Sequence, residues 1–414
     1  MDKGYGPEQE KYDFLQENIK KEKMGLGKII LKLIRMIVLG VILGMMMCVG
    51  FFAIKPWVQK VFPVNSEKVE ISQEPDEQPV DQDTDKEETP VEVIHDIIDY
   101  RELQNALSSV IKEADKKIVT ITGIKQGDNW NTGVAKELTG VIVGDNGREL
   151  LILSTYSNAK DLQLFRAEFV NGATHEAVIK QKDKTNNLAV FSVSKGDMSQ
   201  ETLEKVLVAS LSNTNLVTRG ELLFVIGSPF GYSGGIATGI ISSIDERITR
   251  ADNELRLIVT DIVGNSKSSG VIFTTYGNVM GLVDTSLVAS ANGSPLMAVG
   301  ISQIKEEIQL MSNGKNVPYI GIVGTMISEE TALAENVPQG LFVESVEVDS
   351  PAMAAGIKSG DIITEISGEE IKSLNAYHKV MMKQEAGQAI RLTGQRSGLE
   401  SYVEIKFSVT VGVK

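Results

Sequence analysis

Short apolar runs bounded by turn residues dominate the chain between about residues 100 and 312. The clearest runs cover residues 118–122, 140–143, 149–153 and 222–226. Runs of this length, separated by Gly, Asn and Asp, predict many short strands. The 38 glycines and the low aromatic content of 6% agree with a turn-rich fold. We therefore expect a mainly β region, built as a sandwich or a pair of barrels, with a helix over residues 103–117 leading into it.

Four motifs occur in a fixed order in this region. They read Ile-Leu-Ser-Thr-Tyr-Ser at 152–157, Asn-Asn-Leu-Ala-Val at 186–190, Gly-Ser-Pro-Phe-Gly at 227–231, and Thr-Asp through Gly-Asn-Ser-Lys-Ser-Ser-Gly at 260–270. In this order they resemble the HtrA (DegP-like) family of serine proteases. The resemblance implies a trypsin-like fold of two six-stranded antiparallel barrels, with the active site in the cleft between them.

The catalytic positions inside these motifs hold unexpected residues. In the family, the first motif ends in the base histidine, the second carries the orienting aspartate, and the last carries the nucleophilic serine. Here Ser157 stands at the histidine position and Asn187 at the aspartate position. A serine hydroxyl does not accept a proton near pH 7, and a neutral amide cannot stabilise an imidazolium. The only histidines, His95, His175 and His378, lie in other segments, so we expect none of them to act as the base.

The nucleophile motif is one residue shorter than the family pattern. Alignment forward from the Thr-Asp pair places Ser269 at the nucleophile position, whereas alignment back from the following glycine places Ser268 there. In the forward register, Lys267 replaces a glycine whose N–H contributes to the oxyanion hole. Removing one such donor costs about 100- to 1000-fold in rate. We therefore interpret Ser269, or Ser268, as a vestigial nucleophile position.

A serine–lysine dyad is the alternative that would restore catalysis. It needs a lysine that desolvation keeps neutral. Lys267 adjoins the candidate serines and Lys160 follows Ser157, but we expect both on the surface, where lysines stay protonated. The sequence contains no metal-ligand spacing and no phosphate-binding glycine loop, so we expect neither a metal nor a cofactor.

The C-terminal region carries a long and specific motif. Residues 350–363 read Ser-Pro-Ala-Met-Ala-Ala-Gly-Ile-Lys-Ser-Gly-Asp-Ile-Ile and resemble the signature of a PDZ domain. The resemblance implies an α+β PDZ domain over 317–414, after a protease-like domain over 100–316. It also implies that the peptide-binding residues are those similar to the carboxylate-binding loop, namely Tyr319, Ile320, Gly321 and Ile322.

Such a domain binds a peptide by adding it to an exposed strand edge. Loop N–H groups hold the C-terminal carboxylate, and side-chain pockets give specificity. Residues 373–384 would form the helix that lines the groove. His378 lies on this helix but off the position expected to read a ligand, so we expect a surface histidine.

Residues 36–54 form an uncharged and almost entirely apolar segment. As a helix it would be ~28 Å long, close to the thickness of the hydrocarbon core. Six Lys or Arg residues lie within 20–35, and only two lysines follow closely, which predicts residues 1–35 as a cytoplasmic tail. We expect a single-pass cell-membrane protein with extracytoplasmic C-terminal domains. The alternative, a cleaved signal peptide, is disfavoured by the long apolar segment and the lack of a small-residue cleavage site.

The composition of residues 55–99 predicts an acidic, disordered linker. Residues 64–99 contain 13 Asp or Glu and two Lys, so like charges repel and little apolar surface can be buried. The net charge of −14 argues against nucleic acid as a partner. With Cys48 as the only cysteine, no intrachain disulfide can form.

The resemblance and the altered motifs together predict a bacterial pseudoprotease. It would bind C-terminal or unfolded peptides of envelope or secreted proteins, as a sensor, scaffold or holdase in protein quality control. Two alternatives stay open. One is an active serine endopeptidase with a non-standard site at Ser268 or Ser269, and the other is a purely structural role as the core of the homotrimer that the resemblance implies.

Overall fold

The computed structural model describes residues 68–73, 97–125, 135–157, 159–287, 293–398 and 401–414. All of them belong to one compact unit, Ser66–Lys414. Within these ranges no helix is both long and apolar enough to cross a bilayer. The membrane span predicted at 36–54 and the cytoplasmic tail at 1–35 lie outside the described residues.

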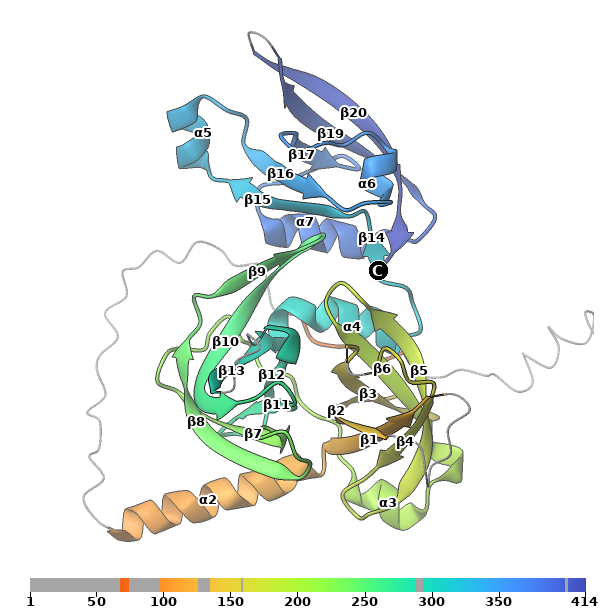
Figure 1. The fold of residues 1–414 in the computed structure, drawn as a ribbon, viewed down its shortest axis with the longest axis vertical. Helices are drawn as coiled ribbons and strands as arrows, with labels where there is room; N and C mark the ends of the chain where they lie inside the picture. The colour runs from red at the N-terminus through yellow and green to blue at the C-terminus, as the bar shows by residue number, and fades with distance from the viewer. Residues whose placement is uncertain (1–67, 74–96, 126–134, 158, 288–292, 399–400) are drawn as a thin grey trace, which may run out of the picture. The chain divides into compact units, whose positions relative to one another are not determined.

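The first barrel is a closed ring of six antiparallel strands in the order β1-β2-β3-β6-β5-β4 (Figure 1). Its interior is apolar, and Phe165 and Phe191 meet edge to face there with ring centroids 5.1 Å apart. The strands are β1 (Ile118–Ile124), β2 (Lys136–Asp145), β3 (Glu149–Thr155), β4 (Leu164–Glu168), β5 (Thr174–Asp183) and β6 (Leu188–Ser194).

The second barrel has a sheet order of β13-β12-β11-β7-β8-β10-β9, and an additional β10–β13 pairing closes six of these strands into a ring. The remaining strand, β9, pairs only with β10, so the two form a hairpin that extends from the ring. The strands are β7 (Leu222–Ser228), β8 (Gly235–Ser243), β9 (Arg247–Arg250), β10 (Asn253–Gly264), β11 (Ser269–Thr274), β12 (Val279–Val283) and β13 (Ser294–Gly300). The double-barrel prediction is thus confirmed.

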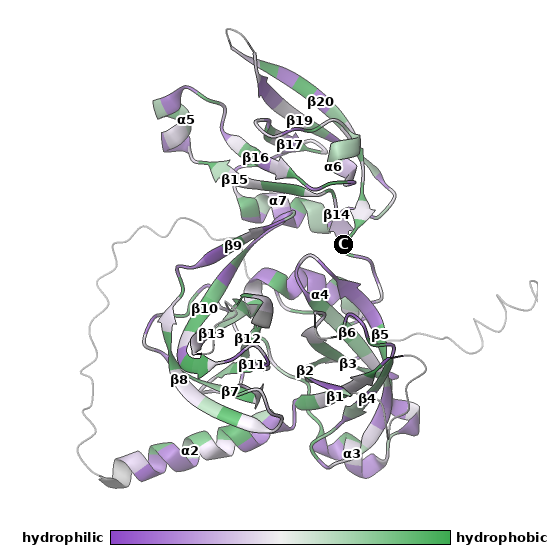
Figure 2. Ribbon diagram, viewed as in Figure 1, coloured by the Kyte–Doolittle hydropathy of each residue, from purple (hydrophilic) through white to green (hydrophobic). Residues whose placement is uncertain are grey.

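Helices flank the two barrels. Helix α2 (Ile97–Asp115) precedes β1 and begins earlier than the sequence pattern indicated. The short helix α3 (Gln200–Lys205) follows the first barrel, and its Ser199 cap accepts a hydrogen bond from the Thr202 N–H. A 3-10 turn, Ile301–Ile304, and helix α4 (Lys305–Ser312) follow the second barrel. Figure 2 shows hydrophobic residues interleaved with hydrophilic ones along the barrel strands, as expected for sheets with one buried face.

The C-terminal domain, predicted to be a PDZ domain, is a sheet in the order β15-β16-β17-β19-β20 with a helix against it. Strand β15 (Ile322–Ile327) is at the edge of this sheet and pairs only with β16 (Gly340–Val346). Helix α7 (Leu374–Met382) is capped by the Ser373 side chain. The other elements are β14 (Pro318–Tyr319), α5 (Glu329–Glu335), α6 (Pro351–Ala354), β17 (Ile362–Ile366), β18 (Glu369–Glu370), β19 (Ala389–Ser397), β20 (Tyr402–Thr410) and β21 (Gly412–Val413).

A short part of the predicted linker contacts the folded domains. Residues 68–73 run without helix or strand past α4. The Val69 N–H donates to the Asn313 side chain at 3.0 Å, and the Asn313 amide donates back to the Val69 carbonyl at 2.9 Å. The Ile71 N–H donates to Gln309 at 3.1 Å. These six residues therefore differ from the disordered linker that the sequence predicted.

His378 is buried, so the expectation of a surface histidine was wrong. Its side chain is 9% exposed, and its Nε2 lies 2.8 Å from the fully buried Glu307 of α4. Burial by itself would lower the pKa of His378, but the negative charge of Glu307 together with hydrogen bonds to Glu306 and Glu307 outweighs this and raises the pKa to about 9. The protonated imidazole thus forms an ion pair between α7 and α4, which the sequence could not show because the two residues are far apart in the chain.

This ion pair predicts a loss of stability at alkaline pH. Because the pKa of His378 is raised on folding, its contribution is complete below about pH 6.5 and is lost as the pH rises through about 9. We expect about 3 kcal/mol of unfolding free energy to depend on this group. Urea unfolding of the full chain and of His378→Gln at pH 6.5 and pH 10 measures it. A stability difference between the two proteins that stays constant with pH would contradict the assignment.

Candidate functional site

The structure brings together the two residues predicted at the histidine and aspartate positions. Ser157 follows β3 and is exposed, whereas Asn187 precedes β6, is 6% exposed and has a positive φ of 59°. The Ser157 N–H donates to the Asn187 side-chain oxygen at 2.6 Å. The contact runs through the backbone of Ser157, so it positions the loop and provides no proton acceptor for a nucleophile.

A buried carboxylate, Asp284, lies on the other side of Asn187. Its Oδ1 accepts from the Asn187 amide at 2.7 Å and from the Ser286 N–H and hydroxyl, and its Oδ2 accepts from Arg250 at 3.2 Å. Burial of a carboxylate is tolerated only when hydrogen bonds and a counter-charge replace its water. Both oxygens of Asp284 are therefore committed to holding the structure together.

Ser268 is fully buried, and its hydroxyl is committed to backbone contacts. The hydroxyl donates to the Pro229 carbonyl at 2.6 Å and accepts from the Asn265 N–H at 2.8 Å. Ser269, the first residue of β11, is 6% exposed, and its hydroxyl lies 3.2 Å from that of Thr139. None of these three contacts gives either serine a base that could remove its proton.

The backbone donors that an oxyanion hole would need are also engaged. In the forward register the Lys267 N–H should face a substrate carbonyl, but it donates to the Asn265 side chain at 2.8 Å. In the backward register the nucleophile's own N–H should do so, but the Ser268 N–H donates to the Asn265 carbonyl at 3.0 Å. Whichever serine aligns with the family nucleophile, at least one donor is satisfied inside the loop.

The histidines that the structure describes lie elsewhere. His175 is half-buried on β5 and contacts the Phe169 ring edge-on at 5.9 Å, and His378 is paired with Glu307. His95 lies outside the described residues. Lys267 and Lys160 are exposed, as the sequence predicted. Among the described residues, no cluster of His, Cys, Asp and Glu could hold a metal ion.

The predicted peptide-binding loop forms a nest of backbone donors. Gly321 adopts a φ of +90°, and a Cβ there would meet Ser350 at 2.4 Å, so only glycine fits this turn. The N–H groups of Ile320, Gly321 and Ile322 converge on one carboxylate, as expected of an anion-binding nest. The Tyr319 hydroxyl instead bonds Glu347, and burial together with this carboxylate raises the pKa of the phenol.

The carboxylate in the nest belongs to Asp252, in the turn between β9 and β10. Asp252 is 1% exposed and was not among the predicted site residues. It also accepts a 2.6 Å hydrogen bond from Tyr377 of α7, and burial next to this carboxylate raises the pKa of the phenol well above its ordinary range. The acidic residue itself was visible in the sequence, but its partner about 70 residues later was not.

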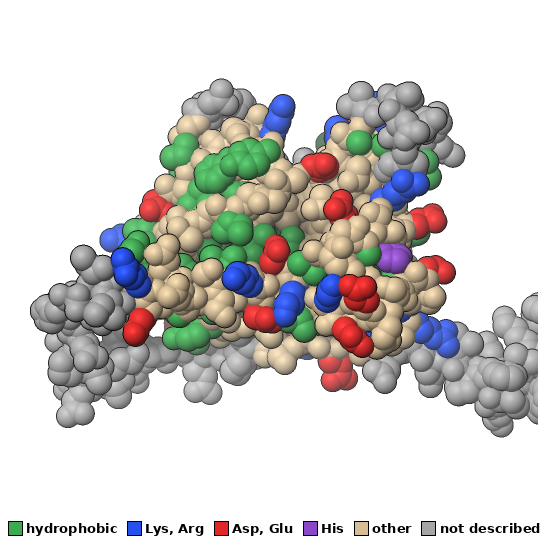
Figure 3. Space-filling model, turned by 90° about the horizontal axis from the view of Figure 1, so that it is seen from below, with side chains coloured by type: hydrophobic (Ala, Val, Ile, Leu, Met, Phe, Trp, Pro, Cys, Tyr) green, Lys and Arg blue, Asp and Glu red, His purple; other side chains and the backbone are tan. Residues whose placement is uncertain are grey.

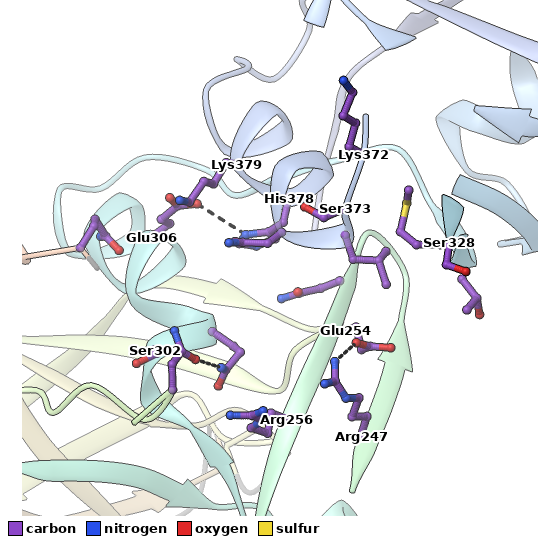
Figure 4. A pocket seen from close by; sticks show the side chains of 18 of the residues that line it. Arg247, Glu254, Arg256, Ser302, Glu306, Ser328, Lys372, Ser373, His378 and Lys379 are labelled. Carbon is purple, nitrogen blue, oxygen red and sulfur yellow. Dashed lines mark hydrogen bonds and ion pairs between the residues drawn. The ribbon is translucent and has the colours of Figure 1, made fainter. Parts of the chain in front are cut away.

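A groove of about 520 Å³ lies where the end of β15 and the start of α7 face the β9–β10 hairpin (Figure 4). Met326 of β15 and Leu374 and Asn375 of α7 line its PDZ side. Arg247 and Glu254 of the β9–β10 hairpin form an ion pair at 2.7 Å on the opposite wall, and Arg256 lies nearby. The groove thus offers a strand edge, apolar contacts and charges of both signs.

The surface in Figure 3 carries acidic and basic side chains side by side, with hydrophobic side chains between them. A nucleic-acid-binding surface requires Lys and Arg gathered in one patch or stripe. This face provides no such patch, in keeping with the net charge of −14.

Comparisons with known proteins agree with the two-part architecture. Residues 138–282 match a trypsin-like peptidase domain, and residues 318–407 match a PDZ domain. Serine protease Do-like HtrA of Lactobacillus helveticus is 24% identical over 339 residues, which cover 74% of this chain and 80% of that protein. Periplasmic serine endoprotease DegP of Escherichia coli (strain K12) is 24% identical over 279 residues, 65% of this chain and 56% of that protein.

Solved structures share the fold. The HtrA-type protease AlgW with a decapeptide aligns with a TM-score of 0.54 at 19% identity, over 74% of this chain and 98% of that one. The serine endoprotease from Yersinia pestis aligns with a TM-score of 0.50 at 21% identity, over 74% and 98%. With a trypsin-like peptidase domain followed by a PDZ domain, and with these relatives, the chain is an HtrA-like protein.

Proposed function

We propose that this HtrA-like protein does not cleave peptides and instead binds them through its PDZ domain. The observation that carries the proposal is the state of the nucleophile loop. The Ser268 hydroxyl is bonded to the Pro229 carbonyl, and the N–H groups of Lys267 and Ser268 are bonded to Asn265. A serine protease needs a base on the hydroxyl and free N–H donors for the oxyanion, and this loop offers no base and keeps at least one of the donors bonded.

Peptide binding is supported by the edge strand, the nest and the groove. An extended segment can pair with the free edge of β15 and place its side chains against α7. AlgW, which shares the fold, was solved with a decapeptide and with a tripeptide. By analogy, we infer that this groove takes the C-terminal or unfolded segments of other proteins.

The predicted membrane span determines where we expect this peptide binding to occur. We infer a single-pass protein of the bacterial cell membrane whose barrels and PDZ domain face outward. There it would meet envelope and secreted proteins as a sensor, scaffold or holdase. A homotrimer, which the family resemblance implies, would present three grooves together, and light scattering after size exclusion would measure the assembly.

The first prediction concerns proteolysis. We expect no cleavage of unfolded casein by the full-length chain in mild detergent, because its candidate nucleophiles lack a base. Ser268→Ala and Ser269→Ala should behave like the wild type. Gel electrophoresis over a day of incubation measures this, with an active HtrA protease as the positive control. Cleavage that disappears only in one serine variant would overturn the proposal and identify a non-standard nucleophile.

The second prediction concerns reconstruction of the triad. Ser157→His with Asn187→Asp should restore no detectable cleavage of casein. In this variant at least one oxyanion N–H donor would still be bonded inside the loop, and the loss of one such donor costs about 100- to 1000-fold in rate. The carboxylate introduced at position 187 would also replace an amide that lies 2.7 Å from Asp284. Two adjacent carboxylates cannot both ionise easily, so the pKa of one of them should rise.

A stability measurement provides the control for this reconstruction. Asn187→Asp should lower the free energy of unfolding by about 1–3 kcal/mol, since a buried hydrogen bond becomes a repulsion. Ser157→His alone, at an exposed position, should change it by less than about 0.5 kcal/mol. Rapid casein cleavage by the double variant would show that the loop opens for substrate, against the proposed inactivity.

The third prediction concerns the groove. Asn375→Trp should lower the affinity for unfolded casein at least about ten-fold, because the indole would fill the space between α7 and β15. Leu333→Trp on α5 is the matched control, since Leu333 is 79% exposed and does not line the groove. Fluorescence anisotropy of labelled casein measures both. Equal binding by the two variants would place the peptide site elsewhere.

A further inference from the structure

The turn between β9 and β10 places a carboxylate in the one position where the PDZ domain should hold a ligand. Asp252 Oδ2 accepts from the N–H groups of Ile320 and Gly321, each at 2.8 Å, and Oδ1 accepts from Ile322 at 3.0 Å. The Tyr377 hydroxyl from α7 adds a fourth donor at 2.6 Å. The PDZ loop and helix α7 thus donate all four hydrogen bonds to one buried carboxylate.

The backbone of Asp252 completes the resemblance to a peptide end. Its N–H donates to the Ile322 carbonyl at 2.7 Å. The last residue of a peptide added to β15 would use the same two features, one N–H for the strand edge and one carboxylate for the nest. Asp252 supplies both, with its side-chain carboxylate in place of a terminal one. Its φ of 60° lets the hairpin turn back immediately after this residue.

We propose that Asp252 is a built-in substitute for a peptide C-terminus, so that a ligand with a free C-terminal carboxylate binds only when the β9–β10 turn withdraws. The inference rests on the proposed peptide-binding function and defines how that site is controlled. One carboxylate must leave before another can enter, since the three N–H donors are saturated. The apparent affinity is then lowered by the small fraction of molecules in which the turn is withdrawn.

The remainder of the groove stays open while the nest is filled. The 520 Å³ groove is lined by Met326 at the end of β15, Leu374 at the start of α7 and the β9–β10 hairpin, and neither Asp252 nor the nest lines it. A peptide can therefore make its first contacts along the strand edge before its terminus reaches the nest. An internal segment, which has no terminal carboxylate, can use this part of the groove without displacing Asp252.

Contacts of Arg250 outside the nest also hold the turn between β9 and β10 in place. Arg250, two residues before Asp252, donates to the Thr185 carbonyl at 2.7 Å and to Asp284 at 3.2 Å. Withdrawal of the turn must therefore break the nest contacts and disturb those of Arg250. We expect the filled state to dominate in the absence of ligand, because all of these groups lie in well-packed, largely buried positions.

The test compares peptide binding by the full-length chain, by Asp252→Gly and by Asp252→Asn. Glycine suits the positive φ and removes the carboxylate, so the turn should still form. The matched control is Asp245→Asn, an exposed acidic residue before β9 that does not line the groove. The probes are fluorescein-labelled decapeptides of one sequence that end in Val, Leu or Phe, each with a free or an amidated C-terminus.

The proposal expects Asp252→Gly to bind at least one free-terminus peptide about ten-fold or more tightly than the wild type does. Asp252→Asn should change in the same direction, Asp245→Asn should match the wild type, and amidated peptides should show no gain. Detectable binding by Asp252→Gly that is no tighter than that of the wild type, or an equal gain for amidated peptides, would overturn it.

Hydrogen exchange without any peptide separates this inference from the proposed function. The amide protons of Ile320, Gly321 and Ile322 should exchange faster in Asp252→Gly than in the wild type, while amides in the barrels stay unchanged. Unchanged exchange at these three amides would overturn the inference. Faster exchange with no peptide bound by any form would retain Asp252 as the occupant of the nest and overturn the peptide-binding function instead.

Discussion

Burial of the Asp252 carboxylate is the constraint on which the arrangement of this protein depends. An ionised carboxylate with no partners is very costly to remove from water, and it becomes tolerable only when several donors replace the lost hydration. Asp252 obtains four donors, three from the PDZ loop and one from Tyr377. The β9–β10 hairpin and the PDZ loop therefore have to meet in one geometry, since a shift of about 1 Å would leave the charge unsatisfied.

The same hairpin connects the PDZ loop to the altered catalytic positions through direct contacts. Asp252 is bonded in the nest, Arg250 is bonded to Asp284, and Asp284 accepts from the Asn187 amide. Asn187 in turn accepts from the Ser157 N–H. A position that orients a base in an active protease thus belongs here to a chain of static hydrogen bonds. Asparagine suits this role better than aspartate, because it can donate to Asp284 and accept from Ser157 at once.

Local sequence patterns predicted the short strands and turns, and the family motifs implied the double barrel and the PDZ fold, both of which the structure and the comparisons support. They also placed Ser157 beside Asn187, because the family motifs carry that geometry. They could not reveal Asp252 in the nest or His378 against Glu307, since each contact joins residues about 70 positions apart. The sequence also could not show how the Ser268 hydroxyl is bonded, because only the fold places it against the Pro229 carbonyl.

The compact nucleophile loop gives a physical reason why, under the proposed inactivity, the altered triad positions and the bonded oxyanion donors occur together. An active protease keeps N–H groups unsatisfied until substrate arrives, and such poised groups reduce stability. Once no base is present, nothing favours keeping them free. The Lys267 and Ser268 N–H groups can then bond Asn265, and the Ser268 hydroxyl can close the loop on Pro229. Each of these bonds stabilises the domain, and each would have to break before the loop could serve a catalytic site.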